Sequence, residues 1–179
     1  QIVFVRETEY FPQPTEDGKN LAISNPYQAT KGEIPRETIH FSINHEVAPH
    51  TERTLTNIPF VIIVPAERMI ETNGPPVNLY AVDTFWDHSL ILPEDSVIVV
   101  SKDAIGKIKI PAQLNGKIRF ISGGDDPLEL QETVYKVIEQ MGFSIISGGK
   151  DYAITKNFDS AIKRLSKESN IELSGRHAH

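Results

Sequence analysis

The sequence predicts an α+β fold in which mainly antiparallel, twisted β-sheets are followed by a helix–hairpin–helix unit. Strand-like runs rich in β-branched and aromatic residues occur throughout residues 1–122, and Pro, Gly and Asn separate them. Apolar residues recur at helical spacing only after Gly123. We therefore expect a β-rich domain with an active-site cleft over 1–122, and a unit packed on it over 123–179.

The predicted strands are, in chain order, residues 2–5, 38–47, 60–64, 79–85, 97–101, 107–110 and 117–121. Residues 60–64 and 97–100 are continuous apolar runs, which indicates central strands covered on both faces. Residues 11–34 are polar and contain several prolines and glycines. This segment is expected to form a long loop with a short helix, and long ordered loops often carry function.

Two helices are expected in the C-terminal third. Asp126 can cap the first helix, and Pro127 suits its first position. The second helix is expected over about residues 158–168, with a hairpin between the two. The pair Gly123-Gly124 precedes a helix start but is not predicted to bind phosphate, because Asp125 and Asp126 place negative charge there.

Composition and charge exclude several classes of protein. The 18 basic and 24 acidic residues give a net charge of -6 without a long block of either sign, which argues against nucleic-acid binding through a broad basic face. The absence of cysteine excludes a disulfide framework, thiolate metal sites and a cysteine nucleophile. The longest apolar stretch, residues 58–65, is too short to span a bilayer. We expect a soluble protein, in the cytoplasm or secreted.

Residues 38–47 alternate between polar and apolar types. On a strand, His40, Ser42 and Asn44 share one face, while Phe41 lies on the other. The polar face either lies in water or lines a cleft. In a cleft, its donors and acceptors would suit a ribose, an amide or a phosphate.

A histidine-dependent hydrolase, with or without a metal, is an alternative interpretation. His40, His45, His50, Asp83 and His88 lie within a short span of the chain. Spacings of five separate His40 from His45 and Asp83 from His88, so each pair would point to opposite faces of a strand. A metal site would therefore need a bulge or a turn to bring these ligands together.

The only tryptophan lies in the segment of residues 83–100, which is rich in acids before Ser96 and ends in an apolar run. Trp86 either packs as a lid on the core or forms a wall of the cleft together with Asp87 and Glu94. In the second case the wall belongs to the cleft that also contains His40 and Ser42.

Three segments resemble the mono-ADP-ribosyltransferase toxins and effectors of bacteria, over about residues 1–122. They are Val-Phe-Val-Arg-Glu (3–7), Thr-Ile-His-Phe-Ser (38–42) and Asp-His-Ser-Leu-Ile-Leu-Pro-Glu (87–94). In that family an early strand carries an Arg or His that holds the dinucleotide, and a middle strand carries a Ser or Thr. An acid lies beside a later strand of apolar residues followed by proline.

The resemblance implies a transferase that uses NAD as a substrate and modifies a protein target or a small-molecule acceptor. Arg6 would bind a phosphate of NAD, and Ser42 with Asn44 would position the ribose. The ring of Phe41 or Trp86 would stack on nicotinamide.

For catalysis the resemblance implies Asp87 or Glu94, together with Ser42 and His40. An acid at this position would stabilise the positive charge that develops on the ribose when nicotinamide leaves. A third interpretation is a non-catalytic module whose acidic surface recognises a protein partner.

Overall fold

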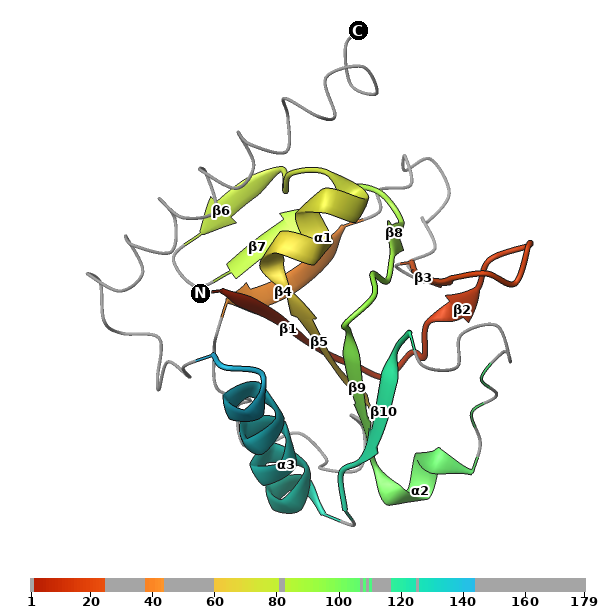
Figure 1. Cartoon of the computed structure of the whole chain (residues 1–179), viewed down its shortest axis with the longest axis vertical. Coiled ribbons are helices and arrows are strands. Elements are labelled where there is room, and N and C mark those ends of the chain that lie inside the picture. Colours follow the sequence, from red (N-terminus) through yellow and green to blue (C-terminus); the bar gives the residue numbers. More distant parts are fainter. Residues whose placement is uncertain are drawn as a thin grey trace, which may run out of the picture.

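The structure is a computed structural model that describes residues 2–24, 38–43, 60–80, 83–106, 108, 110, 117–124 and 126–143 (Figure 1). The second C-terminal helix expected over residues 158–168 lies outside these ranges. So does the expected hairpin, apart from Phe143. Within the described ranges, no helix has the length and apolar character needed to cross a membrane.

A seven-stranded sheet runs in the order β10-β9-β5-β1-β4-β7-β6. Neighbouring strands are antiparallel except β9 and β10, which are parallel. The bounds are β1 Val3–Thr8, β4 Ile39–Ile43, β5 Phe60–Pro65, β6 Asn78–Tyr80, β7 Asp83–Trp86, β9 Val97–Val100 and β10 Arg119–Ser122. The predicted α+β fold with mainly antiparallel sheets is confirmed, and β5 and β9 are interior strands as expected.

A three-stranded sheet in the order β2-β3-β8 accompanies it, with bounds β2 Gln13–Pro14, β3 Leu21–Ile23 and β8 Leu90–Ile91. The prediction of a loop with a short helix is therefore wrong for the described part of residues 11–34. Leu21 and Ile23 are buried on either side of a half-buried Ala22. This alternation is too short to stand out among the surrounding polar residues, and pairing with β2 and β8 decides the conformation.

The helices are α1 Ala66–Asn73, α2 Lys102–Ile105 and α3 Pro127–Gln140. The first two were not predicted, because each is short and follows a strand almost directly. The predicted strand 79–85 is instead divided between the antiparallel strands β6 and β7, and Ile108 and Ile110 are not in a strand. The prediction for α3 is confirmed, since the Asp126 carboxylate accepts a hydrogen bond of 2.9 Å from the Glu129 amide.

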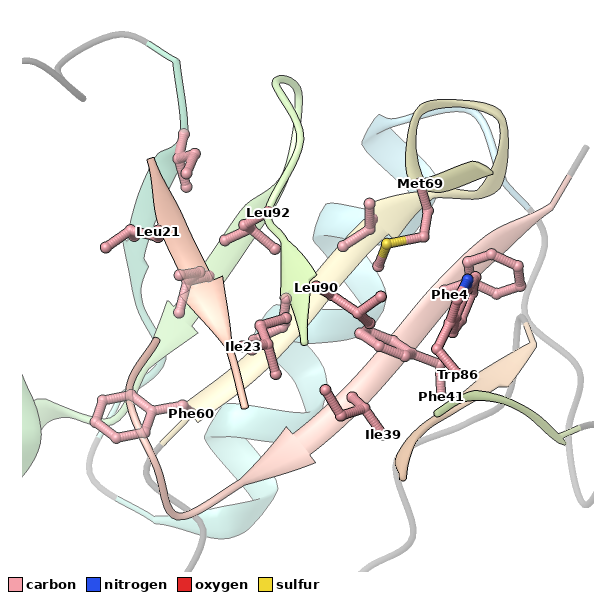
Figure 2. Packing of buried hydrophobic residues seen from close by; sticks show 14 of the residues in the cluster. Phe4, Leu21, Ile23, Ile39, Phe41, Phe60, Met69, Trp86, Leu90 and Leu92 are labelled. Atoms are coloured by element: carbon pink, nitrogen blue, oxygen red, sulfur yellow. The ribbon is translucent and has the colours of Figure 1, made fainter. Parts of the chain in front are cut away.

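Each face of the larger sheet has its own hydrophobic core. On one face, residues such as Phe4, Ile62 and Met69 pack with α1 and the smaller sheet; we call this the α1-side core (Figure 2). On the other face, residues such as Val5 and Val134 pack with α3 and form the α3-side core. Because alternate residues of a strand point to opposite faces, membership of these cores fixes the direction of each neighbouring side chain.

Candidate functional site

The predicted polar face of residues 38–47 exists in β4, and it lies on the α3 side of the sheet. Ile39 and Phe41 belong to the α1-side core. His40 and Ser42 alternate with them and are exposed and half-buried, respectively. Ser42 lies opposite Val5 of the α3-side core in the strand register. Asn44, the third predicted residue of this face, lies outside the described residues.

Arg6 points to the opposite face of the sheet from Ser42. It alternates with Val5 along β1, and it lies opposite Ile62 of the α1-side core in β5. The sheet therefore separates the Arg6 side chain from the side chains of Ser42 and His40. The expectation that Arg6 and Ser42 hold one dinucleotide together is wrong in this arrangement.

Phe41 and Trp86 are core residues and present no ring face to a ligand. Their exposed fractions are 1% and 0%, and their rings meet edge-on at 5.9 Å (Figure 2). Trp86 also packs edge-on against Phe4 at 5.4 Å, and its indole N–H donates to the carbonyl oxygen of Gly74 at 3.0 Å. The prediction that one of these rings stacks on nicotinamide is therefore wrong, because both rings are buried in the α1-side core.

The two predicted acids lie in different loops, and neither lines the cavity at Arg6. Asp87 is exposed just after β7, and Glu94 is exposed in the turn before β9. Glu94 lines a small cavity of about 150 Å³ together with Lys117 and Thr72. Neither acid lines the cavity at Arg6. The structure thus scatters the predicted catalytic residues over several surfaces.

The described residues contain no group of three or more His, Asp or Glu side chains arranged to hold a metal. His40 and His88 are both exposed. The ring of His40 lies 5.2 Å from the ring of Phe85, and the Nδ1 atom of His88 lies 2.9 Å from the carbonyl oxygen of Ser89. His45 and His50 fall outside the described ranges, so the metal-dependent alternative stays a prediction for those two residues.

Of the predicted site residues that the structure describes, Arg6 alone lines the cavity that we call the Arg6 pocket. This cavity has a volume of about 260 Å³ and lies where the end of β1 meets the smaller sheet. The described residues that line it are Arg6, Thr8 and residues 10–13 and 22–24. Apart from Arg6, the lining residues were not predicted individually. For those from Phe11 onward, the only sequence signal was the general expectation of function in residues 11–34, and no signal pointed to Thr8 or Tyr10.

Arg6 is half-buried, and its hydrogen-bonding capacity is only partly used. Its Nη1 atom donates to the carbonyl oxygen of His40 at 3.0 Å, just beyond the last recorded β1–β4 pair, Val5 with Ser42. Its Nε atom is buried without a hydrogen-bond partner. Desolvation lowers the pKa of the guanidinium below its ordinary value. No carboxylate among the described residues forms an ion pair with Arg6.

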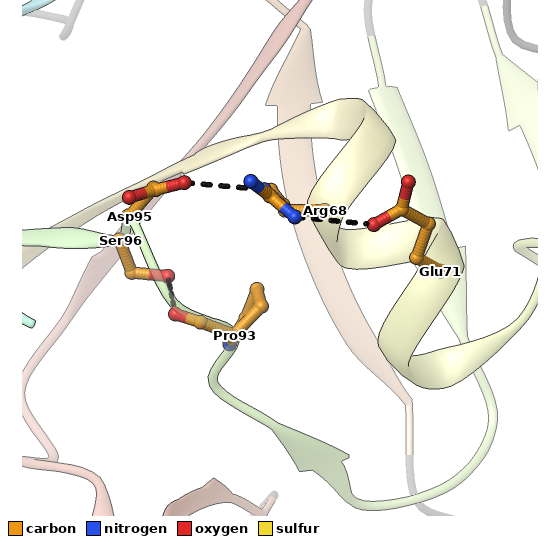
Figure 3. A network of polar contacts seen from close by, with 5 residues as sticks. All are labelled: Arg68, Glu71, Pro93, Asp95 and Ser96. Carbon is orange, nitrogen blue, oxygen red and sulfur yellow. Dashed lines mark hydrogen bonds and ion pairs between the residues drawn. The ribbon is translucent and has the colours of Figure 1, made fainter. Parts of the chain in front are cut away.

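Arg68, unlike Arg6, forms ion pairs with carboxylates. This exposed arginine is paired with Asp95 at 3.1 Å and with Glu71 at 3.5 Å (Figure 3). An exposed guanidinium has little need of a counter-charge, because water solvates it. A half-buried guanidinium loses part of that solvation, and buried charges in proteins are normally paired. Arg6 is therefore the cation in the described structure with the clearest unmet demand for an anion.

Tyr10 lies at the Arg6 pocket and is held there through Thr8. The amide of Tyr10 donates to the Thr8 hydroxyl oxygen at 3.0 Å, and that hydroxyl donates to the carbonyl oxygen of Tyr10 at 3.4 Å. Thr8 itself is buried, whereas 57% of Tyr10 is exposed. The turn after β1 thus holds the backbone of an exposed aromatic residue that lines the same cavity as Arg6.

Comparison with protein families, with curated proteins and with solved structures finds no match to this chain. The function must therefore be argued from the site itself.

Proposed function

We propose that this chain is a ligand-binding domain that takes an anionic group in the Arg6 pocket. The observation that supports the proposal is the half-buried guanidinium of Arg6, which lines a cavity and has a buried Nε atom without a partner. Arginine binds carboxylates and phosphates through two parallel N–H donors, and an anion in the cavity would compensate the charge of the guanidinium. The cavity supplies the space in which such an anion would lie.

An NAD-using transferase remains the specific form of this proposal that the family resemblance implies. In that form a phosphate of NAD would bind Arg6, and a protein target would accept the ADP-ribose. The geometry supports only the Arg6 part of it, because Ser42 and His40 lie on the other face of the sheet. A binding function without catalysis, the third interpretation of the sequence, needs nothing beyond the pocket.

The test is thermal unfolding and calorimetric titration of the whole chain with NAD, pyrophosphate, phosphate and small carboxylates at constant ionic strength. A ligand that binds only the folded state raises the Tm, and the stabilisation grows with the logarithm of the ratio of free ligand concentration to Kd. We expect at least one anion to raise the Tm of the native protein and of Arg119→Met. Arg119 is exposed on β10 and does not line the pocket, so it is a charge-matched control.

Arg6→Met keeps the aliphatic length of the side chain but removes the guanidinium, and the stabilisation by the anion should be lost in this variant. The proposal is refuted if no anion raises the Tm, or if Arg6→Met responds as strongly as Arg119→Met. Release of nicotinamide from bound NAD would support the transferase form. Binding of NAD without release would favour a non-catalytic domain.

A further inference from the structure

We infer that the natural ligand of the Arg6 pocket is a monocarboxylate with an apolar body about the size of one large amino-acid side chain. This inference rests on the proposed function and narrows it to a class of ligand. It depends on the juxtaposition of one guanidinium with an apolar wall in a small cavity.

The charge of the lining favours a single negative charge. Among the residues that the structure describes, Arg6 is the only lysine, arginine, aspartate or glutamate that lines the pocket. A carboxylate would be neutralised one for one, whereas a phosphate dianion or a pyrophosphate would carry uncompensated charge into a partly desolvated site. The net charge of -6 on the whole chain adds to the repulsion of a polyanion.

The volume of the pocket favours a small ligand. At about 260 Å³ it falls below the range of roughly 300–1,000 Å³ that is usual for drug-sized ligands. A complete dinucleotide would have to extend well outside it. A carboxylate with one ring or one branched chain would fit within it.

The wall of the pocket is apolar and firmly held. Phe11 is half-buried and packs on Phe60 at 5.3 Å and on Phe120 at 6.1 Å between ring centroids. Pro12 and Ile23 are buried beside it. Because this wall is anchored in the α1-side core, it can receive an apolar group without first having to become ordered. Tyr10, which also lines the pocket, offers a further ring surface to the ligand.

Two sources can supply such a carboxylate: a free organic acid, or the C-terminus of a peptide that ends in an apolar residue. The probes for calorimetric titration distinguish them. Phenylacetate is compared with phenylacetamide, its neutral counterpart of nearly equal shape. N-acetyl-Ala-Ala-Phe with a free carboxylate is compared with the same peptide as its C-terminal amide. Phosphate, pyrophosphate and NAD complete the set.

We expect at least one carboxylate to bind about tenfold or more tightly than its amide, since a hydrogen bond to a charged group contributes at least that factor. Arg6→Met should abolish this preference, and Arg6→Lys should reduce it, because lysine keeps the charge but not the paired donors. Ala22→Leu should weaken binding by filling the pocket. Glu16→Ala, an exposed change in the turn between β2 and β3 and outside the described lining, should not. Thermal unfolding of each variant confirms that it is folded.

Each outcome decides a separate question. Binding of the peptide alone identifies a chain terminus as the source, binding of phenylacetate alone identifies a free acid, and binding of both shows that the carboxylate and its ring suffice. Equal affinity for acid and amide overturns the inference. Arg6-dependent binding of phosphate, pyrophosphate or NAD without any carboxylate also overturns it but leaves the proposed function standing. If no anion binds, both the carboxylate inference and the proposed function are refuted.

Discussion

Asn73 holds both main-chain polar groups of Ile91. Its side-chain oxygen accepts from the Ile91 amide at 2.8 Å, and its side-chain nitrogen donates to the Ile91 carbonyl oxygen at 2.8 Å. Asn73 ends α1, and Ile91 belongs to β8, one of the two edge strands of the smaller sheet. The side-chain amide of Asn73 thus makes the hydrogen bonds that a neighbouring strand would otherwise make with Ile91. These bonds connect the end of α1 to the edge of the smaller sheet.

Asn73→Ala should destabilise the protein by about 1–3 kcal/mol, because it leaves two partly buried main-chain groups without these partners. The measurement is the free energy of unfolding from urea denaturation. Glu71→Ala on the same helix removes only an exposed ion pair with Arg68 and should change that free energy by less than about 1 kcal/mol. Equal effects of the two changes would contradict this role of Asn73.

Asp95 has a φ of 70°, a left-handed conformation that side chains other than Asn, Asp and Gly adopt at a cost. It is also paired with the exposed Arg68 (Figure 3). Asp95→Asn keeps the tolerance for this conformation and loses the charge, so it should cost less than about 1 kcal/mol. Asp95→Val should cost about 1–2 kcal/mol more, because a β-branched side chain is strained there. If unfolding experiments give both variants the same free energy of unfolding, the left-handed conformation at position 95 does not disfavour a β-branched side chain.

Gly123 connects β10 to α3 at a point of close packing. A Cβ atom at this position would collide with Cδ1 of Leu130 and lie 3.0 Å from Cγ1 of Val99, both in the α3-side core. Gly123→Ala should therefore destabilise the protein by about 1–3 kcal/mol.

Gly106 provides the matched control for that change. A Cβ atom there meets nothing within 4 Å, and its φ of -80° suits alanine. Gly106→Ala should leave stability unchanged or raise it by up to about 1 kcal/mol. A Tm for Gly123→Ala equal to that for Gly106→Ala would show that the junction can relax.

Asp17 should report on the turn between β2 and β3. Its pKa lies below its ordinary value, first because the Thr15 hydroxyl donates to its carboxylate at 2.6 Å and then because the Lys19 amide donates at 3.0 Å. Since the folded-state pKa is the lower one, this stabilisation is present above the unfolded pKa of about 4 and is lost as the pH falls through the folded value.

Thr15→Val removes the larger cause and should raise the pKa of Asp17 towards its ordinary value, measured by NMR titration of the side-chain carboxyl carbon. Thr133→Val, which removes a hydroxyl that donates to the carbonyl oxygen of Glu129 in α3, should leave that pKa unchanged. A titration of Asp17 that is identical in all three proteins would rule out the hydroxyl as its cause.

The elements that sequence analysis could predict are those with a strong local signal. β5 and β9 are continuous apolar runs, and α3 combines helical spacing with a capping aspartate and a proline at its start. By contrast, α1 has only eight residues and begins directly after a strand. The two-residue strands β2 and β8 exist only because they pair with β3, which no local pattern reveals.

The candidate site was harder to predict for a related reason. Alternation along β4 correctly placed His40 and Ser42 on one face and Phe41 on the other. Whether Arg6 shares the face of Ser42 depends on the pairing of Val5 with Ser42, a contact between strands that are far apart in the sequence. A shift of this register by one residue would have placed the Arg6 and Ser42 side chains on the same face of the sheet.

The burial of Trp86 makes the protein its own folding indicator. It is the only tryptophan of the chain, it lies fully inside the α1-side core, and it does not line the Arg6 pocket. In the native protein its fluorescence emission should therefore be blue-shifted, and its indole ring should be protected from quenching by acrylamide. Both properties should disappear on unfolding. Fluorescence can thus follow the stability of every variant described above without direct contact between the fluorophore and a bound ligand.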